Sequence, residues 1–327
     1  FWFARWVKRQ RRRNLIAAQL ALLAATLTRP EGFLIFGVLA GLGLLLVLGA
    51  RARGQVGRYL GALLVYAAPF AVYFAWRYQH FGYLLPNTFY AKTGGGLFQA
   101  LRGGKYTVLF ALLFGLPLAP LAAAALWEQP WRRPGWRLLD GRAWAAWARS
   151  SIGLVTCTAV IAAYSAYVVF VGGDYMAMFR FFVPVLPLIY LVFAQAAYRL
   201  FARIAHSPPK LRLAQLMLVG AFMLTLLQST RLEQYLYNQP WFMHGTWRGV
   251  QHERWHVARN TLAGEFFRDL KRSNDESLAV LGIGIVPYVA DMRVFSFHGV
   301  VDPIIAHKDP PREVGTFVAG HEKVDYV

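Results

Sequence analysis

Three short polar segments carry the residue types that could do chemistry in an otherwise apolar sequence. They are Arg29–Gly32, the segment 81–92 with Asn87 and Lys92, and the segment 172–180 with Asp174 and Arg180. The first segment adds a second carboxylate, that of Glu31. Guanidinium and ammonium groups bind phosphate, and carboxylate and amide groups bind sugar hydroxyls or orient the cations. The three segments therefore suit an anionic lipid headgroup that carries a sugar.

Each segment also has a purely structural interpretation. Arg29 and Glu31 could pair with each other to hold a turn. Asp174 follows two glycines and could cap the next helix, because aspartate is a favoured N-cap residue. Lys92 could be an interfacial lysine whose charged end reaches water. The sequence leaves both interpretations open for all three segments.

The composition indicates that membrane helices position these residues. The chain has 327 residues, of which 57% are hydrophobic and 16% are charged. Soluble domains have about 45–50% apolar and about 25% charged residues, so an ordinary soluble enzyme and a disordered chain are both excluded. The net charge is +19, and only four of the 16 acidic residues lie before residue 230. We expect a transmembrane domain over 1–229 and a mixed-charge, water-facing α/β domain over 230–327.

The predicted fold is mainly α, a polytopic bundle of transmembrane helices. A helix needs roughly 20 apolar residues to cross a bilayer. Five segments fit this length, namely 59–79, 105–127, 150–171, 181–200 and 211–229. The stretch 14–49 is apolar except in its middle, where Pro30 and Gly32 interrupt a continuous helix. We expect this stretch to form a helical hairpin whose arms are short for a full span.

The distribution of Lys and Arg predicts the orientation in the membrane. Basic residues concentrate in alternate loops, at 5–13, 51–58, 132–149 and 199–212. By the positive-inside rule these loops are cytoplasmic, which puts the three polar segments and residues 230–327 on the outer face. Because the basic residues then meet anionic lipid, we expect no nucleic-acid partner.

The sequence after residue 230 indicates one helix and two strands. Ser277–Val289 and Met292–Val301 are rich in β-branched and aromatic residues, which is typical of strands. The pair Gly282 and Gly284 lacks the helix start and the third glycine of a dinucleotide-binding fingerprint, so we expect no such site. The predicted helix, Glu253–Arg272, has apolar residues at helical spacing, namely Trp255, Ala258, Leu262, Phe266 and Leu270.

Cysteine and histidine usage gives no metal or disulfide site. Cys157 is the single cysteine and lies in an apolar run, so no intrachain disulfide can form. The candidate metal ligands, which are His298, Asp302, His307 and His321, have spacings that match no established zinc pattern. Structural hydrogen bonding is therefore the favoured interpretation of these side chains.

Five motifs taken together resemble the bacterial GT-C-type glycosyltransferases. The closest group is the polytopic arabinofuranosyltransferases of actinobacterial cell walls and their uncharacterised relatives. The resemblance covers the chain from about residue 14 to its end. The motifs are LTRPEG (27–32), LLPNTFYAKTGG (84–95), GGDYM (172–176) with Arg180, DMRVFSFHGVVDP (291–303) and GHEK (320–323).

The resemblance implies a reaction at the outer face of the bacterial cytoplasmic membrane. A sugar moves from a polyprenyl-phosphate donor to a cell-envelope glycan or lipid acceptor, with inversion. The principal base of such enzymes lies in a first outer loop that has no counterpart here. The chain begins at Phe1, so we expect an N-terminal portion and part of the C-terminus to be missing and this chain alone to be inactive.

The resemblance also implies roles for individual residues. Asp174 and Arg180 would be catalytic, and Arg180 with Lys92 would stabilise the departing phosphate. No cofactor is assigned, and the metal requirement is open, with a divalent cation compatible with Asp174 and Glu31. The residues implied to bind donor or acceptor are Arg29, Glu31, Asn87, Lys92, His298, Asp302, His321 and Lys323.

Two functions from other classes remain open. A transporter or flippase for a lipid-linked sugar would also have broken helices and intramembrane charge pairs. Such proteins usually contain internal repeats, and segments 14–127 and 150–229 show no repeat. A non-catalytic membrane subunit that binds the polyprenyl lipid is the third possibility. An acidic pair in a preceding outer loop would support the enzyme, and its absence would support a binder.

The predicted orientation can be tested by chemical labelling of introduced cysteines. Ser273→Cys should react with a membrane-impermeant thiol reagent in intact spheroplasts, because residue 273 is predicted to lie outside. Arg137→Cys, in a predicted cytoplasmic loop, should not react until the membrane is opened. The reverse pattern would invert the topology and remove the three polar segments from the outer face.

Overall fold

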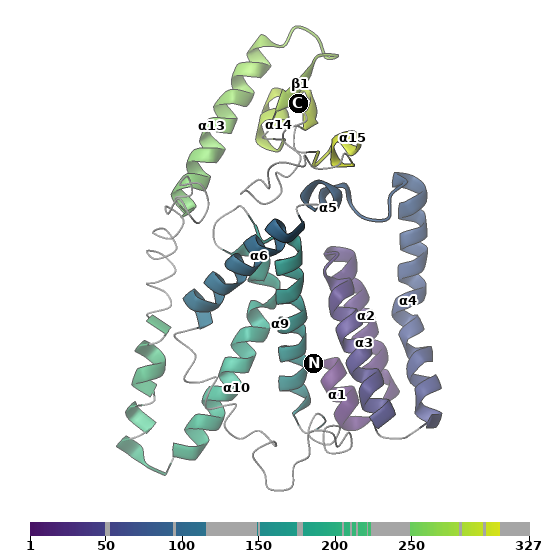
Figure 1. Ribbon diagram of the computed structural model, residues 1–327, viewed down its shortest axis with the longest axis vertical. Coiled ribbons are helices and arrows are strands. Elements are labelled where there is room, and N and C mark those ends of the chain that lie inside the picture. Colours follow the sequence, from purple (N-terminus) through teal and green to yellow (C-terminus); the bar gives the residue numbers. More distant parts are fainter. Residues whose placement is uncertain are drawn as a thin grey trace. The chain divides into compact units, whose positions relative to one another are not determined.

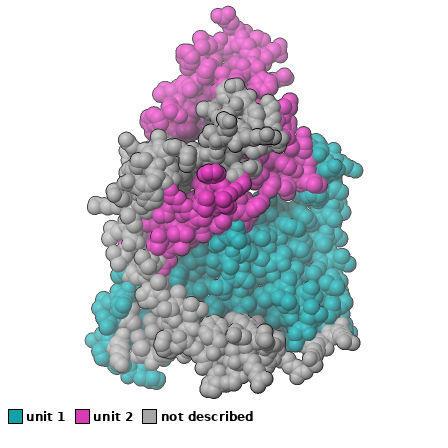
Figure 2. Space-filling model, viewed as in Figure 1, with its two compact units in different colours: residues 1–82, 118–166, 182–220 teal, residues 83–117, 167–181, 221–327 magenta. Residues whose placement is uncertain are grey.

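The computed structural model is mainly helical, as predicted (Figure 1). It describes residues 1–49, 53–93, 96–115, 149, 151–174, 179–204, 206–209, 211–213, 215–220, 222–223, 249–280, 283–296 and 299–307. The chain divides into two compact units, which Figure 2 distinguishes by colour. Unit 1 comprises 1–82, 118–166 and 182–220, and unit 2 comprises 83–117, 167–181 and 221–327. The domain boundary expected near residue 230 stays a prediction.

Unit 1 contains the helical hairpin that the sequence predicts. After the short helix α1 (Trp2–Arg9), the arms are α2 (Arg12–Thr28) and α3 (Gly32–Gly49). The chain leaves helical geometry at Arg29, where φ is −144° and ψ is 129°. Gly32 allows the close turn, since a Cβ atom there would lie 2.6 Å from the backbone of Thr26. Any larger residue would therefore push the two arms apart at the turn.

The long helix α4 (Arg53–Phe81) packs on this hairpin through buried tyrosines. The hydroxyls of Thr26 and Tyr66 are 2.9 Å apart, and the Tyr66 ring stacks on Phe36 with centroids 3.7 Å apart. Nearer the N-terminal end of α4, the Tyr59 hydroxyl donates to the Ala40 carbonyl oxygen at 2.9 Å. Each buried ring thus places its hydroxyl on a partner, as burial of a polar group in an apolar environment requires.

Within the described part of the chain, four helices are long and apolar enough to cross a membrane, namely Gly32–Gly49, Gly54–Phe81, Ile152–Val171 and Arg180–Arg199. Large apolar side chains on them are exposed, among them Leu45, Val72 and Phe170 at 68%, 72% and 63%. Exposed apolar side chains on such helices suit contact with lipid and give the chain the character of a membrane protein. Gly32–Gly49 reaches this length by itself, although the sequence analysis expects it to be short for a full span.

The predicted spans correspond to described helices to different extents. The spans at 59–79, 150–171 and 181–200 correspond to α4, to α9 (Ile152–Val171) and to η4 (Arg180–Val185) with α10 (Leu186–Ile204). Of 105–127, the structure describes α6 (Gly96–Phe110) and the π-helical turn η1 (Ala111–Gly115). Residues 116–127 lie outside the described part of the chain, as do most residues of 221–229.

Unit 2 contains a small parallel sheet after α13 (Gly249–Leu270). Its strands are β1 (Ser277–Val280) and β2 (Arg293–Ser296), with Ser277 opposite Arg293 and Val280 opposite Ser296. The helix α14 (Ile285–Ala290) lies between them in sequence, and the short helix α15 (Pro303–Ala306) follows. A parallel pair needs a crossover connection, and α14 provides it.

The prediction of one strand over Ser277–Val289 is therefore wrong from Ile283 onward, where a turn leads into α14. The strand predicted over Met292–Val301 is confirmed at Arg293–Ser296 and is wrong at 299–301, where the chain bends. A short apolar run has no periodicity that separates a strand from a buried helix, so the sequence could not distinguish them. The expectation that no helix begins after Gly284 is also wrong, because α14 starts at the next residue. The described residues still lack the third glycine of the dinucleotide fingerprint.

The α6 helix contacts the end of α9 so closely that one position must be glycine. A Cβ atom on Gly103 would lie 2.3 Å from the carbonyl oxygen of Val169, whereas a Cβ atom on Gly104 would meet nothing within 4 Å. The two neighbouring glycines thus differ only in what surrounds them.

We expect opposite effects of alanine at these two positions. Gly103→Ala should destabilise the protein by about 1–3 kcal/mol, the usual cost of overpacking. Gly104→Ala should leave stability unchanged or raise it by about 0.5–1 kcal/mol, because alanine is the better helix former. Thermal unfolding of the purified variants in one detergent measures both changes. Equal melting temperatures for the two variants would contradict the close packing of α6 on α9.

Candidate functional site

The candidate site is built on the turn that ends α9. Gly172 and Gly173 have φ angles of +84° and +72°, a left-handed conformation that glycine adopts without strain. Their amides donate to the carbonyl oxygens of Val169 and Val168, which satisfies the last turn of the helix. Asp174 follows immediately, and its side chain is only 1% exposed. The turn therefore buries a carboxylate at the end of an apolar helix.

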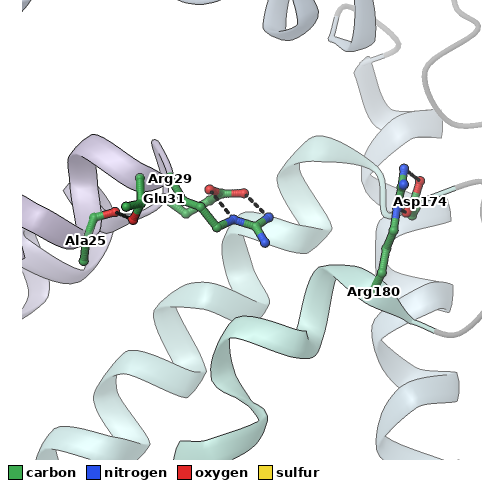
Figure 3. Close-up of polar contacts among 6 residues, drawn as sticks. Ala25, Arg29, Glu31, Asp174 and Arg180 are labelled. Atoms are coloured by element: carbon green, nitrogen blue, oxygen red, sulfur yellow. Dashed lines mark hydrogen bonds and ion pairs between the residues drawn. The ribbon is translucent and has the colours of Figure 1, made fainter. Parts of the chain in front are cut away.

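Arg180 binds this carboxylate with a two-pronged contact (Figure 3). Its Nη2 donates to Oδ1 of Asp174 at 3.1 Å, and its Nε donates to Oδ2. The Arg180 side chain is 44% exposed, although its partner is buried. Asp174 thus holds the Arg180 guanidinium in a fixed orientation, while part of the Arg180 side chain stays accessible to solvent.

An aromatic cluster fixes the backbone conformation of Phe179, the residue before Arg180. Phe179 has a φ angle of +48°, which is uncommon and costly for a bulky residue, and is 2% exposed. Its ring packs against those of Tyr106, Phe110 and Phe114, with centroids 5.0, 5.8 and 6.0 Å away. Burial of the ring offsets the backbone strain and holds the adjacent Arg180 beside Asp174.

The α6 helix supplies a second guanidinium to the same turn. Nε of Arg102 donates to the Gly172 carbonyl oxygen at 3.0 Å, and Nε2 of Gln99 donates to the Phe170 carbonyl oxygen at 3.0 Å. A Cβ atom on Gly172 would lie 2.6 Å from Nη2 of Arg102, so the guanidinium lies directly against the turn. Sequence reasoning missed Arg102, which it treated as one more loop charge. The helical spacing of Gln99, Arg102 and Tyr106 was the signal that could have found it.

The charges around the turn favour an anion. Two guanidinium groups and one carboxylate leave one positive charge in excess, and an arginine can bind phosphate with two parallel hydrogen bonds. The capping interpretation of Asp174 stays a prediction. An N-cap side chain bonds amides two or three residues ahead, and residues 175–178 lie outside the described part of the chain.

Arg29 and Glu31 form the ion pair that the structural interpretation predicts. Nη2 of Arg29 is 3.1 Å from Oε1 of Glu31, and Nε donates to Oε2 at 3.4 Å (Figure 3). Their side chains are 53% and 16% exposed. The pair closes the hairpin turn of unit 1. Asp174 and Arg180 belong to unit 2, so each pair is described by itself.

A third group of predicted residues joins the segment after Gly82 to the end of the described chain. Nδ2 of Asn87, in the short helix α5 (Asn87–Lys92), donates to the carbonyl oxygens of Gly299 and Val300 at 2.8 and 3.3 Å. These contacts link positions 212 and 213 residues apart. Asn87 thus has a structural use in this contact, which the sequence could not indicate.

Asp302 and His307 take part in the same contact region. Oδ1 of Asp302 accepts hydrogen bonds from the amides of Ile304 and Ile305 at 2.9 and 3.2 Å, so Asp302 caps α15. The His307 ring stacks on Tyr83 and packs against Tyr90, with centroids 3.9 and 4.3 Å away. Tyr83 and Tyr90 are additions that sequence reasoning did not select.

The remaining predicted residues have no described side-chain geometry. Lys92 is the last residue of α5, and nothing is described of its side chain. His298, His321 and Lys323 lie outside the described residues, so their predicted roles stay predictions. Within the described ranges, no group of three or more His, Cys, Asp and Glu side chains could hold a metal ion.

Comparisons with protein-family models, with curated proteins and with solved structures found no match for this chain.

The ion pair at the turn should contribute measurably to stability. Arg180→Gln would leave the buried Asp174 carboxylate without its two-pronged partner. We expect a loss of about 1–3 kcal/mol, the usual cost of an unsatisfied buried polar group. The double variant Asp174→Asn with Arg180→Gln should regain part of this loss, because two amides can pair. Thermal unfolding that gives wild-type stability for Arg180→Gln would contradict the pair's structural contribution.

Proposed function

We propose that this protein is a membrane glycosyltransferase. It moves a sugar from a polyprenyl-phosphate donor to a cell-envelope glycan or lipid acceptor on the outer face of the bacterial cytoplasmic membrane. The observation that carries the proposal is the Arg180 guanidinium, which is fixed on a buried carboxylate and yet part exposed. The motif resemblance supports the same reaction.

The arrangement at the turn suits a phosphate leaving group. When the bond between sugar and phosphate breaks, negative charge builds on the lipid phosphate. A cation that is already oriented stabilises this charge without reorganising during the reaction. Arg180 would make that contact, and Arg102 adds positive charge at the same turn.

Asp174 would act through Arg180. Its side chain is 1% exposed and both carboxylate oxygens contact the guanidinium, so it is poorly placed to reach an acceptor hydroxyl. Its role in the proposed reaction is to orient Arg180 and to keep its charge in place. Proton abstraction from the acceptor would then fall to a residue other than Asp174.

Two long-range contacts support the predicted sidedness. Asn87, in a segment predicted to lie outside, binds Gly299 and Val300 in the tail predicted to lie outside. Arg149, in a loop predicted to be cytoplasmic, donates to the Leu46 carbonyl oxygen at 3.2 Å, close to the predicted cytoplasmic loop 51–58. Each contact joins segments that the positive-inside rule assigns to the same side of the membrane.

The proposal is tested by measuring sugar transfer by the purified protein. In proteoliposomes, labelled sugar should move from a polyprenyl-phosphate donor to an envelope acceptor. Arg180→Lys keeps the charge but loses the two-pronged geometry, so transfer should fall about 10- to 100-fold, equivalent to about 1.4–2.7 kcal/mol. Arg58→Lys, at an exposed position in a predicted cytoplasmic loop, is the matched control and should transfer normally.

Three results would contradict the proposal in different ways. Normal transfer by a folded Arg180→Lys variant would remove Arg180 from the reaction. Failure of the wild-type protein to bind polyprenyl phosphate would exclude polyprenyl-phosphate sugars as its donors. Movement of an intact lipid-linked sugar across the membrane, without transfer, would favour the flippase.

A further inference from the structure

The helix α13 carries a stripe of large apolar side chains that are exposed in the structure. Trp255, Leu262, Phe266 and Leu270 are 53%, 66%, 60% and 56% exposed. Their spacings of seven, four and four residues put them on one face of a helix. They belong to the set that the sequence analysis places at helical spacing, and the structure leaves their side chains exposed.

A different face of α13 packs on the small sheet domain. Gly264 is buried there, and a Cβ atom on it would lie 2.6 Å from Cβ of Val289 in α14. Position 264 lies about half a helical turn away from the stripe, because each residue advances by about 100°. The stripe and the packed face therefore point in nearly opposite directions.

Charged side chains accompany the stripe, and the basic ones are in excess. Residues 249–272 contain Arg254, Arg259, Arg268, Lys271 and Arg272 against three acids, Glu253, Glu265 and Asp269. Arg268 lies 3.6 Å from Asp269, and Lys271 lies 3.3 Å from Asp291. The Arg259 guanidinium lies over the Trp255 ring, 4.6 Å from its centroid. An arginine beside an aromatic ring at the edge of an apolar stripe is typical of helices that lie in the headgroup region of a bilayer.

We propose that the α13 stripe lies in the surface of an anionic lipid bilayer, with the helix in the plane of the interface. Three observations select this occupant over a second copy of the chain. The stripe is apolar, and residues 249–272 carry five basic and three acidic side chains, a net positive charge that complements anionic headgroups. The same chain has helices that are long and apolar enough to cross a membrane, so a bilayer is available as the partner of this helix. The connecting sequence 224–248 also contains interfacial residue types, namely Tyr235, Tyr237, Trp241 and Trp247.

This placement would hold the domain of β1, α14 and β2 at the membrane surface. A helix anchored by four large apolar side chains keeps the attached sheet next to the headgroups, where lipid-linked molecules expose their polar parts. The inference depends on the membrane character of the chain and not on the proposed glycosyl transfer. It can therefore fail or hold independently of that function.

Spin labels on α13 test the placement in the full chain. In a Cys157→Ser background, we would label Leu262→Cys and Phe266→Cys separately. The matched control is Val257→Cys, which is 51% exposed in the structure but lies off the stripe. Thermal unfolding of each labelled protein confirms that it is folded. The host membranes are vesicles of phosphatidylglycerol with phosphatidylcholine, or of phosphatidylcholine alone.

Collisional relaxation by oxygen and by a water-soluble nickel chelate reports whether each label contacts lipid. In the vesicles with phosphatidylglycerol, we expect the ratio of oxygen to nickel relaxation to be several times higher at 262 and 266 than at 257. We expect this difference to shrink in phosphatidylcholine alone and at high salt, because screening weakens the contact with anionic lipid.

Three outcomes would overturn the inference. Equal, water-like accessibility at 257, 262 and 266 would show that the stripe does not enter lipid. Spin–spin broadening that disappears on dilution with unlabelled protein, without lipid accessibility, would assign the stripe to a second copy. Equal insertion with and without phosphatidylglycerol would overturn the anionic-lipid part of the proposal.

Discussion

The ion pair between Asp174 and Arg180 is the interaction on which the candidate site depends. A carboxylate that is 1% exposed needs a charged partner, since an unpaired charge in an apolar environment is costly. The turn at Gly172 and Gly173 places the carboxylate in a buried position. The strained backbone at Phe179 directs the chain so that the Arg180 guanidinium lies beside the carboxylate. The aromatic contacts of Phe179 and the α6 side chains Gln99 and Arg102 hold both parts in place.

Several charged and polar groups elsewhere in the described chain also have partners. Arg29 and Glu31 pair at the hairpin turn, and the Tyr66 hydroxyl meets that of Thr26 inside unit 1. Asn87 uses its amide to bind backbone carbonyl groups of the tail. Because these contacts stabilise the fold, a polar residue in this apolar chain does not have to belong to a functional site. What distinguishes the Arg180 pair is its carboxylate, since the Asp174 side chain is 1% exposed and that of Glu31 is 16% exposed.

The two faces of α13 differ in size and in packing, and the proposed contact with a bilayer would explain the difference. In a soluble domain, the most apolar face of a surface helix is expected to pack on the core. Here a face centred on the small residue Gly264 packs on α14, and the larger apolar side chains remain exposed. A bilayer offers a second apolar environment, so exposure of such a stripe is not a defect in a chain of this kind.

The sequence by itself determined the local features of this protein. Apolar length predicts the helices α4, α9 and α10, the residues Pro30 and Gly32 predict the hairpin break, and helical spacing predicts α13. It also selects Asp174 and Arg180, whose separation of six residues lets one short loop bring them together. Only the tertiary structure decided which face of α13 packs, that Ile285–Ala290 is a crossover helix, and that Arg102 and Asn87 meet partners 70 and 212 residues away. The reason is physical: periodicity and composition act over a few turns, whereas these contacts depend on how distant segments fill space against each other.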